Sequence, residues 1–236
     1  MNSRWIDIKA QDGGRFKGYL SLPHHAEKGG KGPGIVLIQE IFGVNSHIRA
    51  VADQYASDGY TVLAPDMFWR MQPMVDLGYA QEDIQTGMGY LQTMDFAAAV
   101  KDLAATVAVL RGLPECTDKV AALGYCMGGM LSYLCAADAS VDAAVCYYAG
   151  GIHTRLADAG KIKCPVLFHF GGNDSHIPES VVAAVKQTFS GREGVRIDVY
   201  PGAGHGFNCW DRPAYNQQSA ALARGRSLSF LATTIS

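Results

Sequence analysis

The chain alternates between short apolar runs and longer segments with helical periodicity. Several of the apolar runs are continuous, which is typical of parallel strands buried on both faces. The runs predict strands over 16–22, 34–39, 60–65, 119–125, 143–148, 165–170 and 195–200. The periodic segments predict helices over 46–57, 81–111, 127–137, 180–190 and 215–231. This alternation predicts an α/β fold with a doubly wound, predominantly parallel sheet and helices on both faces.

Composition narrows the domain organisation and the class of partner. With 236 residues, 48% of them hydrophobic, the chain is expected to form one domain over 1–236. A net charge of -2 gives no reason to expect nucleic acid or an anionic membrane surface as partner. The first residues lack the apolar core of a signal peptide, and no apolar run approaches the roughly 20 residues of a membrane span. We therefore expect a cytoplasmic protein that acts on a small molecule.

The run Gly124-Tyr125-Cys126-Met127-Gly128-Gly129 has the form of a nucleophile elbow with a thiol in place of the usual hydroxyl. A buried strand is predicted before it and a helix of small and apolar residues after it. Such a turn needs glycines because its backbone is strained and the neighbouring elements pass close to it. The pattern indicates a cysteine hydrolase with Cys126 as its nucleophile.

An acid and a base follow the elbow in the order found in α/β-hydrolases. Asp174 lies directly after the predicted strand 165–170, and His205 lies after the last predicted strand, 195–200. Active sites of such sheets form at the carboxyl ends of the strands, so we expect Cys126, Asp174 and His205 to meet there. His176, two residues from Asp174, remains the alternative base. The sequence contains no HExxH motif and no phosphate loop, and we expect neither metal nor cofactor.

The segment after strand 34–39 provides the second half of an oxyanion hole. By position, its donors are the backbone N–H groups of Ile41 and Met127. Glu40 stands next to this hole. The spacing alone slightly favours the interpretation of Glu40 as a surface carboxylate at the end of a strand.

Six motifs spread over nearly the whole chain occur together. They are QEIFGVN at 39–45, APDMF at 64–68, LGYCMGG at 123–129, YYAGG at 147–151, FHFGGND at 168–174 and AGHGF at 203–207. In this combination the sequence resembles the dienelactone hydrolases, or carboxymethylenebutenolidases. The resemblance implies a compact monomer with the α/β-hydrolase fold that opens a lactone or cleaves a small ester through a thiol acyl-enzyme. It also implies a triad of Cys126, His205 and Asp174, with Glu40 bonded to the resting thiol until substrate turns the thiol towards the histidine.

The substrate is where the sequence departs from the family. Typical members bind the substrate's carboxylate with two arginines, one before the long central helix and one four residues after the catalytic histidine. Residues 71–100 contain no lysine or arginine, and the second position is Cys209. Arg70 and Arg212 are the nearest candidates. We therefore expect a less anionic lactone or ester, in a pocket lined partly by Phe42, Trp69, Tyr90 and Trp210.

Three other functions remain open. A carboxylesterase acting on an ester other than dienelactone would use the same residues. A class I glutamine amidotransferase also carries a cysteine on an elbow, but its acid lies two residues after its histidine, where this chain has Phe207. A non-catalytic module that binds small molecules would not need Glu40, Cys126, Asp174 and His205 together.

Overall fold

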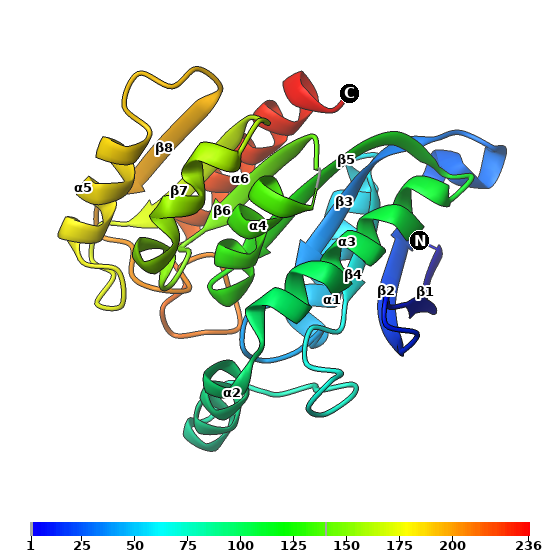
Figure 1. The fold of residues 1–236 in the computed structure, drawn as a ribbon, viewed down its shortest axis with the longest axis horizontal. Helices are drawn as coiled ribbons and strands as arrows, with labels where there is room; N and C mark the ends of the chain where they lie inside the picture. The colour runs from blue at the N-terminus through cyan, green and yellow to red at the C-terminus, as the bar shows by residue number, and fades with distance from the viewer. Residues whose placement is uncertain (1, 140) are drawn as a thin grey trace.

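One eight-stranded sheet runs through the middle of the computed structural model (Figure 1), which describes residues 2–139 and 141–236. The strand order is β1-β2-β4-β3-β5-β6-β7-β8. β2 pairs antiparallel with both β1 and β4, and every later pair is parallel. The strands are β1 (Asn2–Lys9), β2 (Arg15–Leu22), β3 (Gly32–Ile38), β4 (Thr61–Pro65), β5 (Cys116–Tyr125), β6 (Ala143–Tyr147), β7 (Val166–Gly171) and β8 (Val195–Tyr200).

Helices cover both faces of the sheet. α3 and α4 pack side by side on one face, while α1 and α6 lie on the other (Figure 1). The helices are α1 (Ser46–Ser57), α2 (Gln81–Thr93), α3 (Phe96–Gly112), α4 (Met127–Asp138), α5 (Glu179–Thr188) and α6 (Gln217–Thr234), with 3-10 segments η1 (His24–Lys28) and η2 (Ile152–Lys161). The α/β fold and all seven strands expected from the apolar runs are confirmed.

Two elements differ from the sequence-based expectation. β1 escaped it because this edge strand alternates exposed and half-buried residues and carries no continuous apolar run. The helix expected over 81–111 is two helices, because Asp95 ends the first stretch and caps the second. Its carboxylate accepts hydrogen bonds from the backbone N–H groups of Ala97 and Ala98 at 2.9 and 3.0 Å. This break turns α2 away from α3, with consequences for the active site.

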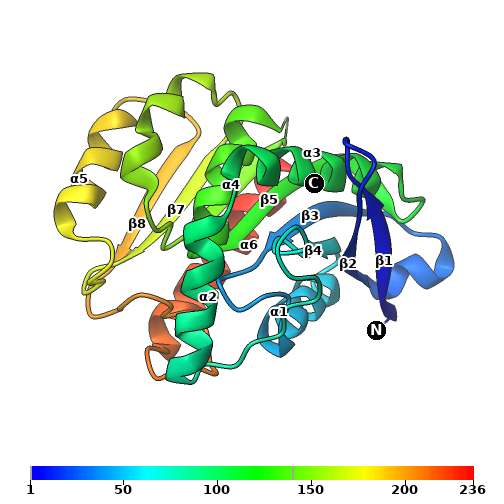
Figure 2. The same cartoon turned by 60° about the horizontal axis from the view of Figure 1, so that its bottom comes forward.

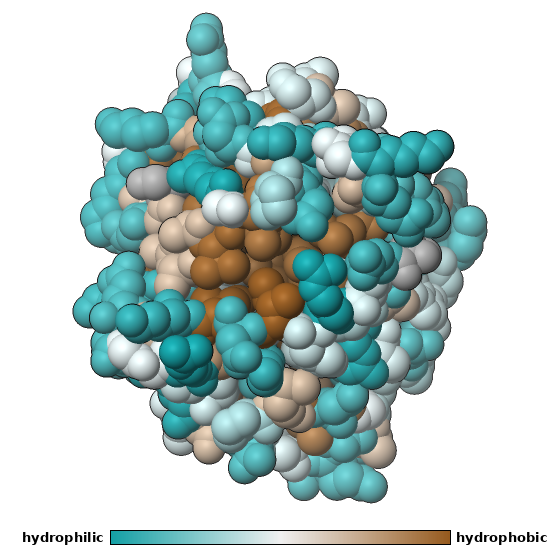
Figure 3. Space-filling view, turned by 90° about the vertical axis from the view of Figure 1, so that its right-hand side faces the viewer, coloured by the Kyte–Doolittle hydropathy of each residue, from teal (hydrophilic) through white to brown (hydrophobic). Residues whose placement is uncertain are grey.

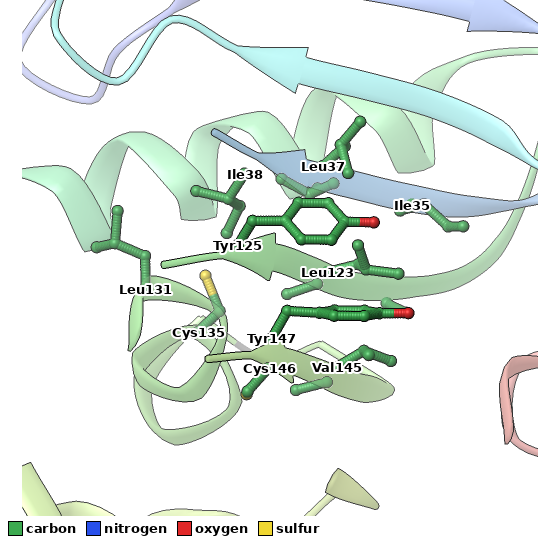
Figure 4. Packing of buried hydrophobic residues seen from close by; sticks show 14 of the residues in the cluster. Ile35, Leu37, Ile38, Leu123, Tyr125, Leu131, Cys135, Val145, Cys146 and Tyr147 are labelled. Atoms are coloured by element: carbon green, nitrogen blue, oxygen red, sulfur yellow. The ribbon is translucent and has the colours of Figure 1, made fainter. Parts of the chain in front are cut away.

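The core lies between the central strands and the helices that cover them. Figure 4 shows core side chains on the central strands, among them Leu37 and Ile38 of β3, Leu123 of β5 and Val145 of β6, with Leu131 of α4 to their left. All are fully buried. The strands hold the loops at their carboxyl ends in fixed positions, and the expected reactive residues Glu40, Cys126, Asp174 and His205 lie in those loops.

Figure 3 views the side of the molecule on which β1 forms an edge of the sheet. Apolar residues gather at the centre of this face, and polar side chains surround them. Within the described residues, no helix has the length and apolar character needed to cross a membrane.

A buried polar network ties three strands to α6. His169 of β7 is fully buried, and its Nδ1 lies 2.9 Å from the hydroxyl of Tyr200 in β8. Its Nε2 lies 2.9 Å from Ser227 Oγ of α6, which in turn lies 2.7 Å from the hydroxyl of Tyr147 in β6. Burial lowers the pKa of His169 to about 3, and the positive charges of Arg226 and Arg196 add to this effect. The imidazole is therefore neutral in the folded protein.

This network makes folding stability sensitive to acid. Between pH 6.5 and about 3, the unfolded chain holds a proton at this histidine that the folded chain does not. The free energy of unfolding is therefore expected to fall as the pH drops below 6.5, with a slope of about 1.4 kcal/mol per pH unit from this one proton. His169→Gln should remove this part of the slope and cost about 1–3 kcal/mol at pH 7 from lost buried hydrogen bonds.

The measurement is urea unfolding from pH 7.5 to 4.5. His153→Gln at an exposed position is the matched control and should keep the wild-type slope. An unchanged slope in His169→Gln would contradict the assignment. Buried His47, whose pKa burial lowers to about 4, contributes with the same sign and leaves some acid sensitivity in either variant.

Candidate active site

Cys126 occupies a strained turn between β5 and α4. Its backbone has φ 56° and ψ -115°, a conformation that side chains rarely adopt. The glycines around it are required by close contacts, because a Cβ on Gly124 would lie 2.2 Å from the carbonyl oxygen of Gly128. A Cβ on Gly128 would lie 2.3 Å from the carbonyl oxygen of Ile38 in β3. The GYCMGG pattern therefore presents the thiol at the carboxyl end of the central strands.

The three residues expected to act together form one hydrogen-bonded chain. His205 Nε2 lies 3.1 Å from Cys126 Sγ, and His205 Nδ1 lies 2.8 Å from Asp174 Oδ2. Asp174 Oδ1 accepts from the backbone N–H groups of His176 and Ile177, at 2.8 and 3.2 Å. Both oxygens of this fully buried carboxylate are thus satisfied, and the imidazole is held towards the sulfur.

Charge around His205 favours its protonated form. Burial alone would lower the pKa of this imidazole, but the Cys126 sulfur and the Asp174 carboxylate raise it to about 10. Burial alone would likewise raise the pKa of Asp174, yet the bonds from His205 and from the two amides hold it below its usual value. The imidazole can therefore hold a proton while it bridges Asp174 and Cys126.

His176, the alternative base, lies beside this chain and does not replace His205 within it. Its side chain is 71% exposed, and its ring centre is 4.8 Å from that of His205. Asp174, His176 and His205 each offer a ligand atom within 4.8 Å of the others, which is compatible with a metal ion. Both Asp174 oxygens, however, already accept hydrogen bonds from His205 and from backbone amides.

Two backbone N–H groups were expected to act as oxyanion donors near Cys126. Ile41 follows β3 and lines the same cavity as Cys126, and Met127 is the first residue of α4. Across 2–139 and 141–236, neither N–H donates to an acceptor in the protein. The N-terminus of α4 adds the positive end of its helix dipole. These donors are available to an oxygen atom that carries developing negative charge.

Glu40 is buried beside this site and pairs with Arg212, whose role the sequence did not assign. The side chain is 2% exposed, and Oε1 accepts a hydrogen bond from Arg212 Nη1 at 3.1 Å. Oε2 has no hydrogen-bond partner among the described residues. Burial raises the pKa of Glu40, and the charges of Arg212 and His205 offset part of that rise. The surface position considered for Glu40 is therefore wrong.

The implied bond between Glu40 and the resting thiol is also absent from this structure. The thiol faces His205, and the carboxylate is paired with Arg212. Arg212 reaches Glu40 because its loop folds back against the turn at Gly206, where a Cβ would lie 2.4 Å from Arg212 Nη1. In the sequence, the glycine at position 206 is the one local feature that relates to this packing, because its φ of 79° and the nearby guanidinium both disfavour a side chain there.

A cavity of about 490 Å³ opens onto the thiol. Its lining comes from the loop after β3, from α2, from the starts of α3 and α4, and from the loops of the acid and the base. The lining residues are Ile41, Phe42, Ile84, Met88, Leu91, Phe96, Cys126, Met130, Gly150, Gly151, His176, His205 and Arg212. Phe42 therefore lies in the cavity wall as expected.

The other three aromatic residues expected in the pocket lie elsewhere. Trp69 stacks on Phe16 and donates from Nε1 to Asp102. Tyr90 packs against Phe68, with ring centres 5.1 Å apart. Trp210 is 37% exposed and packs edge-on against His47. These aromatic side chains are explained by packing outside the cavity.

Arg70 likewise does not line the cavity, and its guanidinium pairs with two aspartates outside it. Its guanidinium holds buried Asp102 through two hydrogen bonds, of 2.8 and 2.7 Å, and reaches Asp12 at 2.7 Å. Arg212 is thus the one arginine among the residues that line the cavity. Of the residues that line the cavity, the sequence had indicated Ile41, Phe42, Cys126, His176, His205 and Arg212, but none of the apolar residues of α2.

Known proteins share this architecture over the whole chain. The model of the dienelactone hydrolase family matches residues 16–235. A carboxymethylenebutenolidase from Pseudomonas putida is 35% identical over 98% of this chain and 97% of its own. One from Pseudomonas sp. strain P51 is 33% identical over 98% of this chain and 95% of its own.

Solved structures agree. A dienelactone hydrolase from Klebsiella pneumoniae, described as putative in its name, superposes with a TM-score of 0.85 at 26% identity, covering 98% of both chains. The dienelactone hydrolase-like promiscuous phosphotriesterase P91 from metagenomic libraries gives 0.83 at 25% identity, covering 100% of this chain and 99% of its own. With its eight-stranded, mostly parallel sheet, this chain is a hydrolase with the α/β-hydrolase fold and belongs to the dienelactone hydrolase family.

Proposed function

We propose that this protein hydrolyses lactones or small carboxylic esters through an acyl-enzyme on Cys126. The observation that carries the proposal is the hydrogen-bonded chain from Cys126 through His205 to Asp174 in the wall of a cavity. Similarity to carboxymethylenebutenolidases supports the same class of reaction. We expect the protein to act as a monomer, as the resemblance to the family implies.

In the first half of the reaction, the Cys126 sulfur attacks the carbonyl carbon and the carbonyl π electrons move onto oxygen. The N–H groups of Ile41 and Met127 stabilise that oxyanion, each contributing ~3 kcal/mol by analogy with measured oxyanion holes. Collapse of the intermediate breaks the C–O bond, and His205 gives its proton to the departing alkoxide. In a lactone the new alcohol stays attached to the acyl group, so the ring opens without loss of a fragment.

In the second half of the reaction, water hydrolyses the thioester bond between the acyl group and Cys126. His205 takes a proton from water, and the resulting hydroxide attacks the thioester carbonyl. Collapse breaks the C–S bond, releases the carboxylic acid and restores the thiolate. Asp174 holds the imidazole in one tautomer and orientation throughout.

A thiolate nucleophile favours esters over amides. The tetrahedral intermediate expels the better leaving group, and a thiolate is better than an amide nitrogen but comparable with an activated alkoxide. Attack on an amide therefore tends to revert, whereas attack on an ester or a lactone proceeds. The amidotransferase considered from the sequence is disfavoured on a separate ground, because the carboxylate bonded to His205 is that of Asp174 and not of a residue two positions after the histidine.

Acyl-enzyme formation can be measured directly. Mixing the protein with p-nitrophenyl acetate should release a burst of p-nitrophenolate close to one per chain, because the first half-reaction frees the phenolate before water attacks. Acid quenching followed by peptide mass spectrometry should find the acetyl group on Cys126.

Cys164→Ser, which removes another partly exposed thiol, is the matched control and should keep both signals. Hydrolysis of the ester without a burst and without an adduct on Cys126 would contradict a thiol acyl-enzyme.

A further inference from the structure

α2 stands over the carboxyl edge of the sheet, apart from the two helical layers. Figure 2 shows it crossing in front of the strand ends, between α1 and the side of the molecule that carries β7. Gly87 is its one buried residue. A Cβ on Gly87 would lie 2.4 Å from the carbonyl oxygen of Ile41, so the helix rests directly on the loop that carries the proposed oxyanion donor. The position of α2 makes it a wall of the active site.

One face of α2 presents hydrocarbon to the cavity. Ile84, Met88 and Leu91 follow one another at helical spacing, and all three line the cavity. Met88 is 39% exposed, and the other two are partly buried. Phe96 and Met130 extend this apolar surface from the starts of α3 and α4. A ligand that covers this exposed apolar surface removes it from water, which favours binding of the ligand.

Positive charge in the cavity lining comes from elements other than α2. Residues 71–100 contain no lysine or arginine, so α2 cannot pair with an anion. The basic side chains among the lining residues are Arg212, His176 and His205. Arg212 already faces Glu40, and both histidines lie beside Asp174. A carboxylate placed against α2 would lose its water without gaining a partner, which is costly.

We propose that α2 forms an apolar subsite for a neutral hydrocarbon group attached to the scissile ester. The substrates are then uncharged esters or lactones with an alkyl or similar apolar substituent. This proposal rests on the function proposed above and adds the class of substrate. Burial of each methylene contributes about a fourfold gain in affinity, the equivalent of ~0.8 kcal/mol.

Two esters of equal length separate this proposal from an anion-binding site. Their acyl chains are hexanoyl and adipoyl, so the p-nitrophenyl monoesters differ at the chain end, which is methyl in one and carboxylate in the other. The wild type should prefer the hexanoate by at least tenfold in kcat/KM and should gain about fourfold per methylene from acetate to hexanoate. Dienelactone methyl ester should likewise react at least as fast as dienelactone itself.

Ile84→Arg should lower kcat/KM for the hexanoate at least tenfold and raise it for the adipate, because it places a cation against the chain end. Gln85→Arg is the matched control. It adds the same charge to the same helix at an exposed position outside the cavity lining, and it should leave the hexanoate-to-adipate ratio unchanged.

The subsite and the catalytic proposal fail in different ways. A burst from p-nitrophenyl acetate combined with a flat chain-length profile, or with preference for the adipate, overturns the subsite and leaves the thiol mechanism standing. If the wild type cleaves none of the esters, calorimetric binding of methyl hexanoate and monomethyl adipate to Cys126→Ala decides the subsite by itself. Tighter binding of methyl hexanoate supports it, and equal or weaker binding overturns it.

Discussion

Cys126→Ala is expected to lower kcat/KM for p-nitrophenyl acetate by about 10⁴-fold or more, as loss of the nucleophile does in other hydrolases that act through an acyl-enzyme. The thiol lies 3.1 Å from His205 Nε2, and no other thiol lines the cavity among the residues described. Without the sulfur, His205 has nothing to activate for the first half-reaction. The remaining oxyanion donors and binding contacts would supply only residual catalysis.

Cys126→Ser separates the chemistry of sulfur from the geometry of the elbow. A serine hydroxyl fits the turn, but its proton is far harder to remove than that of a thiol, and the variant lacks the sulfur that helps to raise the pKa of His205. We expect turnover well below wild type, with the ester still bound. Stopped-flow release of p-nitrophenolate measures both variants. Turnover by Cys126→Ala within tenfold of wild type would refute nucleophilic catalysis by this residue.

Arg212→Ala is expected to destabilise the fold by about 3–5 kcal/mol, the usual cost of leaving one member of a buried ion pair alone. Glu40 is 2% exposed and Arg212 19%, and Glu40 Oε2 already lacks a hydrogen-bond partner. Removing the guanidinium leaves a buried carboxylate without compensation. Glu40→Gln in the same background should recover part of the loss, because a neutral amide is less costly to bury.

The loss should depend on pH with a defined sign. Burial raises the pKa of Glu40 above 4.5 even beside Arg212, and loss of Arg212 raises it further. The folded state then holds a proton that the unfolded chain has released, so the free energy of unfolding falls as pH rises through this range. Denaturant midpoints should therefore show a larger cost at pH 8 than at pH 5.

Lys17→Ala provides the matched control for the loss of a cation. Lys17 pairs with Asp7 at 2.9 Å, but both side chains are about half exposed, and such a pair contributes ~0–1 kcal/mol. A cost for Arg212→Ala no greater than that for Lys17→Ala would show that the Glu40 pair does not support the fold.

Much of the site could be predicted because its parts are local. Cys126 sits in a turn whose glycines are set by contacts within a few residues and with β3, and a strand and a helix on either side identify it. Asp174 and His205 each follow a strand, and parallel strands end at the same edge of a sheet. Position after a strand was therefore enough to bring these side chains together.

The aromatic pocket residues could not be placed in the same way. Trp69 and Tyr90 are aromatic residues of the kind that often line a binding pocket. In this structure, however, Trp69 packs on Phe16 and Tyr90 packs on Phe68. Hydrophobic pattern separates buried from exposed positions. It does not separate a residue buried against the core from one that faces a cavity, because both remove apolar surface from water.

The sequence by itself determined the order of the strands along the chain, the thiol on its elbow, and the carboxylate and imidazole that follow it. These depend on short-range backbone geometry and on periodic burial, and both leave local patterns. Only the tertiary structure decided that Glu40 pairs with Arg212, more than 170 residues away, and that α2 rather than a set of aromatic residues forms the apolar wall. Those contacts depend on how distant loops close over the strand ends, and spacing along the chain carries no information about that closure.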